Sequence, residues 1–171
     1  MIPIIIENNG TVKKADIYSE WYSYENKKWA NALLVTNETR QKYLTCEDGT
    51  SITQSDILGY FVWIPRYKYK ITTGGSPTPS SIDIVFENFT TTKSIGDAKT
   101  EYFTHPGFNF DNRELNGMWA VKFEISGTIE NPTIKPNTNS LINYNLVDQF
   151  NASKKFNNYG VDVDARITKN T

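Results

Sequence analysis

The sequence has very few of the residues from which metal sites and many catalytic sites are built, because it contains one cysteine and one histidine. Cys46 has no second cysteine for an intramolecular disulfide, which leaves the redox compartment open. Cys46 and His105 together supply too few ligands for a zinc site. No glycine-flanked serine accompanies His105, so a serine-hydrolase triad is not indicated. We therefore expect no metal, no cofactor and no catalytic residue.

The sequence also lacks an excess of charge and a long apolar run. Its 18 Lys and Arg against 19 Asp and Glu give a formal net charge of −1, which predicts neither nucleic acid nor an anionic membrane as a partner. No stretch reaches the roughly 18 apolar residues of a membrane span. Residues 1–6 are too few for a signal-peptide core and have no basic start. We expect no membrane span, and either no export by the general route or a leader that is absent from the given sequence.

Aromatic residues, by contrast, are abundant at 13%, and Asn and Thr fill the intervals between apolar runs. Such a composition favours strands joined by polar turns. The clearest predicted strand is 60–71, in which alternation places aromatic side chains in the core and cations on a solvated face. Cations interleaved with aromatic rings also occur where proteins bind single-stranded nucleic acid, but here they would lie on opposite faces. The inward set is Tyr67, Tyr69 and Ile71, and the outward set is Arg66, Lys68 and Lys70.

Two further segments, 82–87 and 118–125, show the same period of two. The acidic face of 82–87 opposes the cations of 60–71, which predicts an antiparallel hairpin. The predicted inward residues are Ile82, Ile84 and Phe86 in one strand and Trp119, Val121, Phe123 and Ile125 in the other; the outward residues are Asp83, Glu87, Lys122 and Glu124.

One helix is predicted, over residues 141–155. Ile142, Leu146 and Phe150 recur there at helical spacing, and Ser140 is placed to cap the first turn. Further on, Asp162 and Asp164 alternate with valines and, together with Asp148, could hold a calcium ion. Their spacing matches no defined calcium loop, and the same alternation is typical of a half-exposed strand, which is the interpretation we prefer.

The N-terminal part, residues 1–55, has a different character. Two aromatic runs, 20–24 and 29–35, flank four polar residues, which predicts a β-hairpin. Residues 36–55 are polar and predict a linker or a long loop. Trp21 and Trp29 could offer flat stacking surfaces to sugars, or could hold the small hairpin together, and we prefer the second interpretation.

Two runs, FVWIPRY (residues 61–67) and LNGMWAVKFE (residues 115–124), resemble the opening of formylglycine-generating-enzyme-like domains, which have a C-type-lectin-like fold. Together with THPGF (residues 104–108) they are still more similar to proteins of gut Firmicutes and their prophages, among them tail-fibre-like and surface proteins. The resemblance covers roughly residues 16–171. It implies an α+β, mainly β chain, in which a C-type-lectin-like domain over 56–171 follows the N-terminal hairpin segment of 1–55.

Two departures from this family matter for function. The enzymes of the family use a cysteine pair late in the domain, and no counterpart exists here, so oxidase activity is not implied. Residues 165–171 resemble a segment that in relatives runs on into further strands, which predicts a domain incomplete at its C-terminus. In that case Val161, Val163 and Ile167 would be exposed, and the chain would self-associate.

In the fold that the resemblance implies, ligands are bound by long loops held on a rigid sheet. Three long polar loops are expected here: 72–80, 90–110 and 130–139. Phe108 and Phe110 could alternatively plug the end of the sheet. The predicted ligand-binding residues are Tyr102, Phe103, His105, Phe108 and Phe110.

These features lead us to expect a non-catalytic recognition module of a phage tail fibre or a bacterial surface protein, located on the virion or outside the cell. Its expected partner is a glycan or a protein of the host surface, with other tail or surface proteins or a second copy as further partners. Two alternatives remain open: a structural protein of tail or virion assembly, and a degenerate formylglycine-generating-type oxidase.

Overall fold

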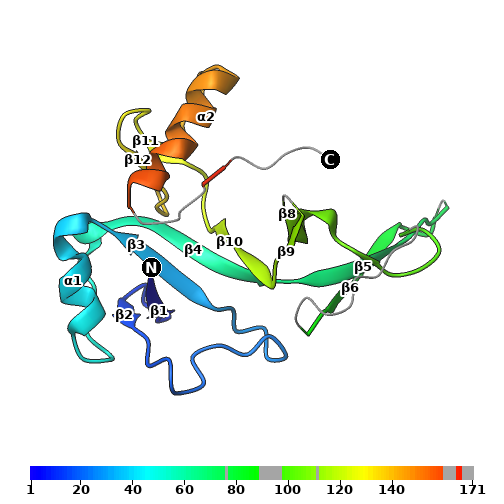
Figure 1. Cartoon of the computed structure of the whole chain (residues 1–171), viewed down its shortest axis with the longest axis horizontal. Helices are drawn as coiled ribbons and strands as arrows, with labels where there is room; N and C mark the ends of the chain where they lie inside the picture. The colour runs from blue at the N-terminus through cyan, green and yellow to red at the C-terminus, as the bar shows by residue number, and fades with distance from the viewer. Residues whose placement is uncertain (76, 89–97, 111, 160–164, 167–171) are drawn as a thin grey trace. The chain divides into compact units, whose positions relative to one another are not determined.

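The structure is a computed structural model that describes residues 1–75, 77–88, 98–110, 112–159 and 165–166. These residues are mainly β and form twelve strands, two α-helices and three 3-10 helices (Figure 1), which confirms the expected class. The chain divides into two compact units: unit 1 is Met1–Val62 with Ala120–Thr171, and unit 2 is Trp63–Trp119. The boundary expected between residues 55 and 56 falls inside unit 1.

Unit 1 is built on a five-stranded sheet in the order β10-β4-β3-β1-β2. β1 pairs antiparallel with both β2 and β3, and β3 pairs antiparallel with β4. β4 ends in unit 2, and β10 begins there. The strand bounds are β1 Ile2–Ile6, β2 Val12–Lys14, β3 Asn31–Val35, β4 Ile57–Pro65 and β10 Gly117–Val121.

The core of unit 1 follows from the alternation of side chains along this sheet. β3 is buried on both faces: Leu33 and Val35 belong to one apolar cluster, and Leu34 belongs to another with Ile134 and Phe156. β1, which is absent from the strands predicted above, adds its buried side chains to the larger cluster. That cluster consists of Ile2, Ile4, Val12, Leu33, Val35, Tyr43, Ile52, Ile57 and Tyr60.

A helix, α1 (Asn37–Thr45), lies where the sequence predicted a linker or long loop over 36–55, so that prediction is wrong. Tyr43 is its one buried residue, which explains why no apolar periodicity revealed the helix. The Tyr43 hydroxyl donates to Asp56 Oδ2 at 2.6 Å and accepts from the Thr53 amide at 3.1 Å. A short 3-10 helix, η1 (Gln54–Asp56), then leads into β4.

The predicted N-terminal hairpin is reduced to one bridge. Ser23 and Lys28 exchange two backbone hydrogen bonds of 2.8 Å, with a four-residue turn between them. The second aromatic run contributes to β3, which pairs with β1 and β4 and not with residues 20–24. The prediction of a continuous hairpin is therefore wrong. The backbone groups of the second aromatic run pair with β1 and β4 instead.

The C-terminal part of unit 1 carries α2 (Leu146–Lys155) and the 3-10 helix η3 (Phe156–Tyr159). Asn145 caps α2 by accepting from the Asp148 amide at 2.9 Å, so the helix begins later than predicted and Ser140 is not its cap. α2 lies beside a small sheet of β11 (Ser126–Gly127) and β12 (Pro132–Thr133) (Figure 1). The apolar residues on which the helix prediction rested are exposed: Ile142, which precedes α2, and Leu146 and Phe150 within it.

Unit 2 contains a three-stranded sheet in the order β6-β5-β7. The predicted antiparallel hairpin between β5 and β6 is confirmed, and Lys70 lies opposite Asp83 as the charge pattern indicated. The elements of this unit are β5 Tyr67–Thr72, β6 Ser81–Phe86, β7 Phe103–Thr104, η2 Pro106–Phe108, β8 Asn109–Phe110 and β9 Arg113–Glu114.

Three burial predictions for these strands are wrong. Arg66 is fully buried instead of solvated. The apolar residues of β6 are exposed because β6 is the edge strand of a small sheet. In β10, Trp119 and Val121 are exposed while Gly117 is buried; the strand ends at Val121 and a bend follows, after which Phe123 packs on the core of unit 1 as predicted. The exposed β6 residues are Ile82, Ile84, Val85 and Phe86.

Candidate functional site

Three of the predicted ligand-binding residues, Phe103, His105 and Phe108, gather on the face of β5 that carries Tyr67 and Tyr69. The His105 ring lies 5.2 Å from that of Tyr67 and 5.6 Å from that of Tyr69. Phe108 meets Tyr67 edge-on at 5.1 Å, and Phe103 meets Tyr69 edge-on at 6.2 Å. This contact set bears out the predicted alternation, which put the two tyrosines on one face of the strand.

Several of these side chains have structural partners. Phe108 is fully buried, so a ligand could not reach it without rearrangement. His105 caps η2, with Nδ1 accepting from the Gly107 amide at 3.1 Å, and burial lowers the pKa of His105. The Tyr102 ring lies 5.6 Å from Lys68 Nζ. The Phe110 side chain is outside the described part of the chain.

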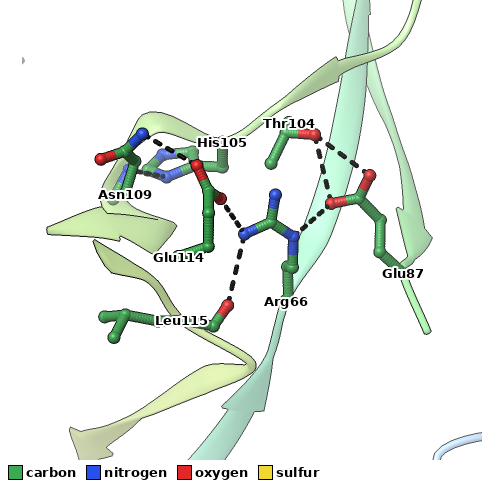
Figure 2. A network of polar contacts seen from close by, with 8 residues as sticks. Arg66, Glu87, Thr104, His105, Asn109, Glu114 and Leu115 are labelled. Carbon is green, nitrogen blue, oxygen red and sulfur yellow. Dashed lines mark hydrogen bonds and ion pairs between the residues drawn. The ribbon is translucent and has the colours of Figure 1, made fainter. Parts of the chain in front are cut away.

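Arg66 forms the centre of a buried polar network (Figure 2). Its Nε donates to Glu87 Oε2 at 2.9 Å and its Nη1 to Glu114 Oε2 at 2.5 Å. Thr104 donates to both oxygens of Glu87, at 3.0 and 3.2 Å. Asn109 donates to the second oxygen of Glu114 at 2.8 Å. The network therefore ties the start of β5 to the segments that follow β6 and to β7, β8 and β9.

The alternation of side chains along residues 60–71 could not predict this network. Arg66 comes directly after the break at Pro65, so the register of the cations in β5 does not extend to it. Its backbone amide donates to the Asn116 carbonyl at 2.8 Å, and its carbonyl accepts from Glu87 at 2.9 Å. A buried charge of this kind is tolerated when it is paired and hydrogen-bonded. The network holds unit 2 together and presents no open surface at Arg66.

Unit 1 contains a hollow of about 740 Å³, large enough for a small ligand or a few sugar units. We call it the aromatic hollow. It lies between the β1–β2 hairpin, the turn after Trp21, and residues that follow β10. Its lining residues are Ile4, Ile5, Ile6, Gly10, Val12, Trp21, Lys27, Lys28, Trp29, Asn31, Gln54, Tyr60, Lys122, Phe123, Pro136 and Asn137.

The aromatic wall of this hollow is held by a chain of ring contacts. Trp21 meets Tyr22 at 5.2 Å, Tyr22 meets Tyr24 at 5.4 Å, and Tyr24 meets Trp29 edge-on at 5.2 Å. The turn between Ser23 and the paired Lys28 fixes these rings on a short loop. Burial raises the pKa of Tyr24 to about 12. Trp29 nevertheless keeps 40% of its surface exposed.

Polar groups lie beside the rings. Lys122 Nζ donates to Asn31 Oδ1 at 2.6 Å, and Asn31 donates to the Trp29 carbonyl at 2.8 Å. Lys28 Nζ donates to the Glu20 carbonyl at 2.9 Å. Desolvation lowers the pKa of Lys122. The sequence pointed to Trp21 and Trp29 as stacking surfaces, but nothing in it indicated that Lys122, about ninety residues away, would join them.

Metal sites and membrane-spanning helices are two further features that bear on function. Across the described ranges, no three His, Cys, Asp or Glu side chains are close enough to hold a metal ion. Asp162 and Asp164, the residues of the calcium alternative, lie outside the described residues, as do Val161, Val163 and Ile167. Of the helices that the structure describes, none is both long and apolar enough to span a membrane.

A comparison of the chain with protein-family models, with curated proteins and with solved structures finds no match in any of the three. The C-type-lectin-like architecture therefore stays a prediction. The candidate ligand site among the described residues is the aromatic hollow of unit 1.

Proposed function

We propose that the chain is a non-catalytic recognition module of a phage tail fibre or a bacterial surface protein, acting on the virion or outside the cell. It binds a glycan of the host surface in the aromatic hollow. The observation that carries this proposal is the exposed Trp29 ring beside amide and ammonium groups in a hollow of about 740 Å³.

The chemistry of the hollow suits a sugar. One face of a sugar ring consists of C–H groups, which pack against flat aromatic rings, while its hydroxyls need donors and acceptors at the rim. Trp21 and Trp29 supply the rings, and Asn31, Gln54 and Asn137 supply amides. The rings are anchored by one another and by a tight turn, so little side-chain freedom is lost when a ligand binds.

The predicted loop of unit 2 is the competing location for the same function. Its Phe103, His105 and Phe108 rings are packed against β5, so we choose Tyr102, which is partly exposed, as the aromatic residue to test. A single ring above a lysine offers a smaller contact than the aromatic hollow. We therefore assign the ligand to unit 1.

A glycan array, followed by calorimetry on any sugar that binds, tests this assignment. Trp29→Ala should weaken binding by about tenfold or more, because central aromatic residues carry most of the energy of a binding site. Trp119→Ala is the matched control, since Trp119 is 38% exposed and lies in unit 2. Circular dichroism checks that both variants fold.

The outcomes separate the alternatives. If Tyr102→Ala abolishes binding and Trp29→Ala does not, the site is the loop of unit 2. If the wild type binds neither the array nor host cells, the recognition function itself is refuted.

A structural role in tail or virion assembly is the second candidate. The exposed apolar side chains along the edge strand β6 favour it, since such an edge can pair with another chain. Ordered tubes or shells in electron micrographs of the purified chain, lost in Ile84→Lys, would support assembly over recognition.

A further inference from the structure

We infer that the aromatic hollow selects an acidic glycan, one whose sugar units carry carboxylate or phosphate groups. This inference rests on the proposed function and narrows its ligand class. It comes from the distribution of charge around the hollow and not from its aromatic wall.

The charged residues that line the hollow all have the same sign. Lys27, Lys28 and Lys122 contribute to its surface, and among the described residues no Asp or Glu does. The chain as a whole has a formal net charge of −1, so the positive charge of the hollow does not follow from an overall excess of cations. Such a local cluster of positive charge raises the concentration of negatively charged ligands near it.

The lysines of the hollow differ from others in unit 1. Elsewhere in the unit, ion pairs neutralise several lysines: Lys13 with Glu7 at 2.6 Å, and Lys14 with Asp48 at 3.3 Å. Within the described residues none of the three lysines of the hollow has a carboxylate within ion-pair distance. Two of them instead donate to neutral oxygens.

Lys122 is the residue on which the inference depends most. It follows β10, and its backbone amide donates to the carbonyl of Tyr60, which also lines the hollow, at 2.9 Å. Desolvation lowers the pKa of its ammonium group, because partial burial without a counter-ion disfavours the charged form. A bound carboxylate or phosphate would supply the missing counter-ion.

Nucleic acid would also bring phosphates to aromatic rings. A glycan is favoured because the formal net charge of −1 does not indicate the basic surface that follows a nucleic-acid backbone. A hollow with amides on its rim is better matched to the hydroxyls of sugars.

Intrinsic tryptophan fluorescence, calibrated by calorimetry, can compare four probes: oligogalacturonate, a glycerol-phosphate oligomer bearing sugar substituents, uncharged malto-oligosaccharide, and oligothymidylate. We expect one of the two acidic probes to bind, and the uncharged sugar to bind at least about tenfold more weakly. Raising NaCl from about 20 to about 500 mM should weaken the acidic probe alone. The preferred acidic probe identifies the group as carboxylate or phosphate.

Lys122→Gln should weaken the acidic probe by about tenfold and leave the uncharged sugar unchanged, whereas Lys70→Gln in unit 2 should change neither. Equal binding of charged and uncharged sugars, both lost in Trp29→Ala but not in Lys122→Gln, overturns this inference and leaves the proposed function standing. Tighter binding of oligothymidylate than of either acidic sugar also overturns it. If no sugar probe binds, this inference fails, and the glycan array and host-cell binding then decide the proposed function.

Discussion

Single residues decide more about this protein than its composition suggests. Arg66 and Lys122 are both cations in strand-like patterns. Arg66 is buried between two glutamates, whereas Lys122 lines a ligand-sized hollow and forms no ion pair with any residue that the structure describes. Burial of Arg66 is explained by its immediate partners. Its guanidinium group has five N–H donors and is hydrogen-bonded to two carboxylates and a backbone carbonyl. Its Nη2 has no hydrogen-bond partner among the described residues, which adds to the desolvation cost.

Replacing Arg66 tests whether this network stabilises unit 2. Arg66→Met removes the cation and leaves Glu87 and Glu114 facing each other with little solvent, so the free energy of unfolding should fall by about 3–5 kcal/mol. Urea unfolding, followed by circular dichroism, measures the change. Lys70→Met, on the neighbouring strand β5, is the control and should change stability by less than about 0.5 kcal/mol. Equal stability of the two variants would contradict a stabilising network.

At the scale of elements, the two runs that carry the family resemblance meet through β4 and β10. In unit 2, the Trp63 and Trp119 rings lie edge-on at 5.3 Å, and Gly117 is buried beneath them. A Cβ at Gly117 would overlap the Trp63 ring and the Ile64 carbonyl oxygen. The close approach of two strands thus explains why a glycine stands at position 117.

Gly117→Ala should therefore destabilise the pairing of these strands. Overpacking of this kind costs about 1–3 kcal/mol, because backbone and ring must both shift. Gly75→Ala is the matched control in unit 2, since a Cβ there meets nothing within 4 Å. The test is the difference between the two urea midpoints. Identical midpoints would show that the overlap is relieved at no cost.

At the scale of the whole molecule, each unit has its own framework: an apolar sheet core in unit 1, and a ring cluster with a buried ion network in unit 2. His105 is the only histidine, so it is the side chain whose ordinary pKa of 6.5 lies nearest neutrality.

Stability should consequently fall as the pH drops below about 6.5. Burial lowers the pKa of His105 in the folded chain, so the unfolded chain binds the proton more readily and stability rises with pH across this window. The loss begins as the pH falls through 6.5 and is complete below the lowered pKa. His105→Gln should lack this component. The stability advantage of the wild type over the variant, measured by urea unfolding from about pH 7.5 to about pH 5, should shrink; a constant difference would argue against it.

The sequence by itself determined the mainly β class, the β5–β6 hairpin and the existence of a C-terminal helix. The class and the hairpin follow from the alternation of side chains and from charge pairing, because neighbouring side chains of a strand point to opposite faces. It also indicated Trp21 and Trp29 as possible stacking residues. It could not indicate α1, because the helix rests on one buried residue, Tyr43.

Only the tertiary structure decided which polar residues are buried and which lie at a possible binding surface. Arg66 meets Glu114 across 48 positions of the chain, and Lys122 meets Asn31 across 91. The apolar residues of β6 are exposed because β6 is an edge strand. Trp119 and Val121 in β10 are exposed, whereas Phe123, after the bend that follows β10, packs on the core of unit 1. Such outcomes depend on which strands become neighbours, a long-range property that no local pattern encodes.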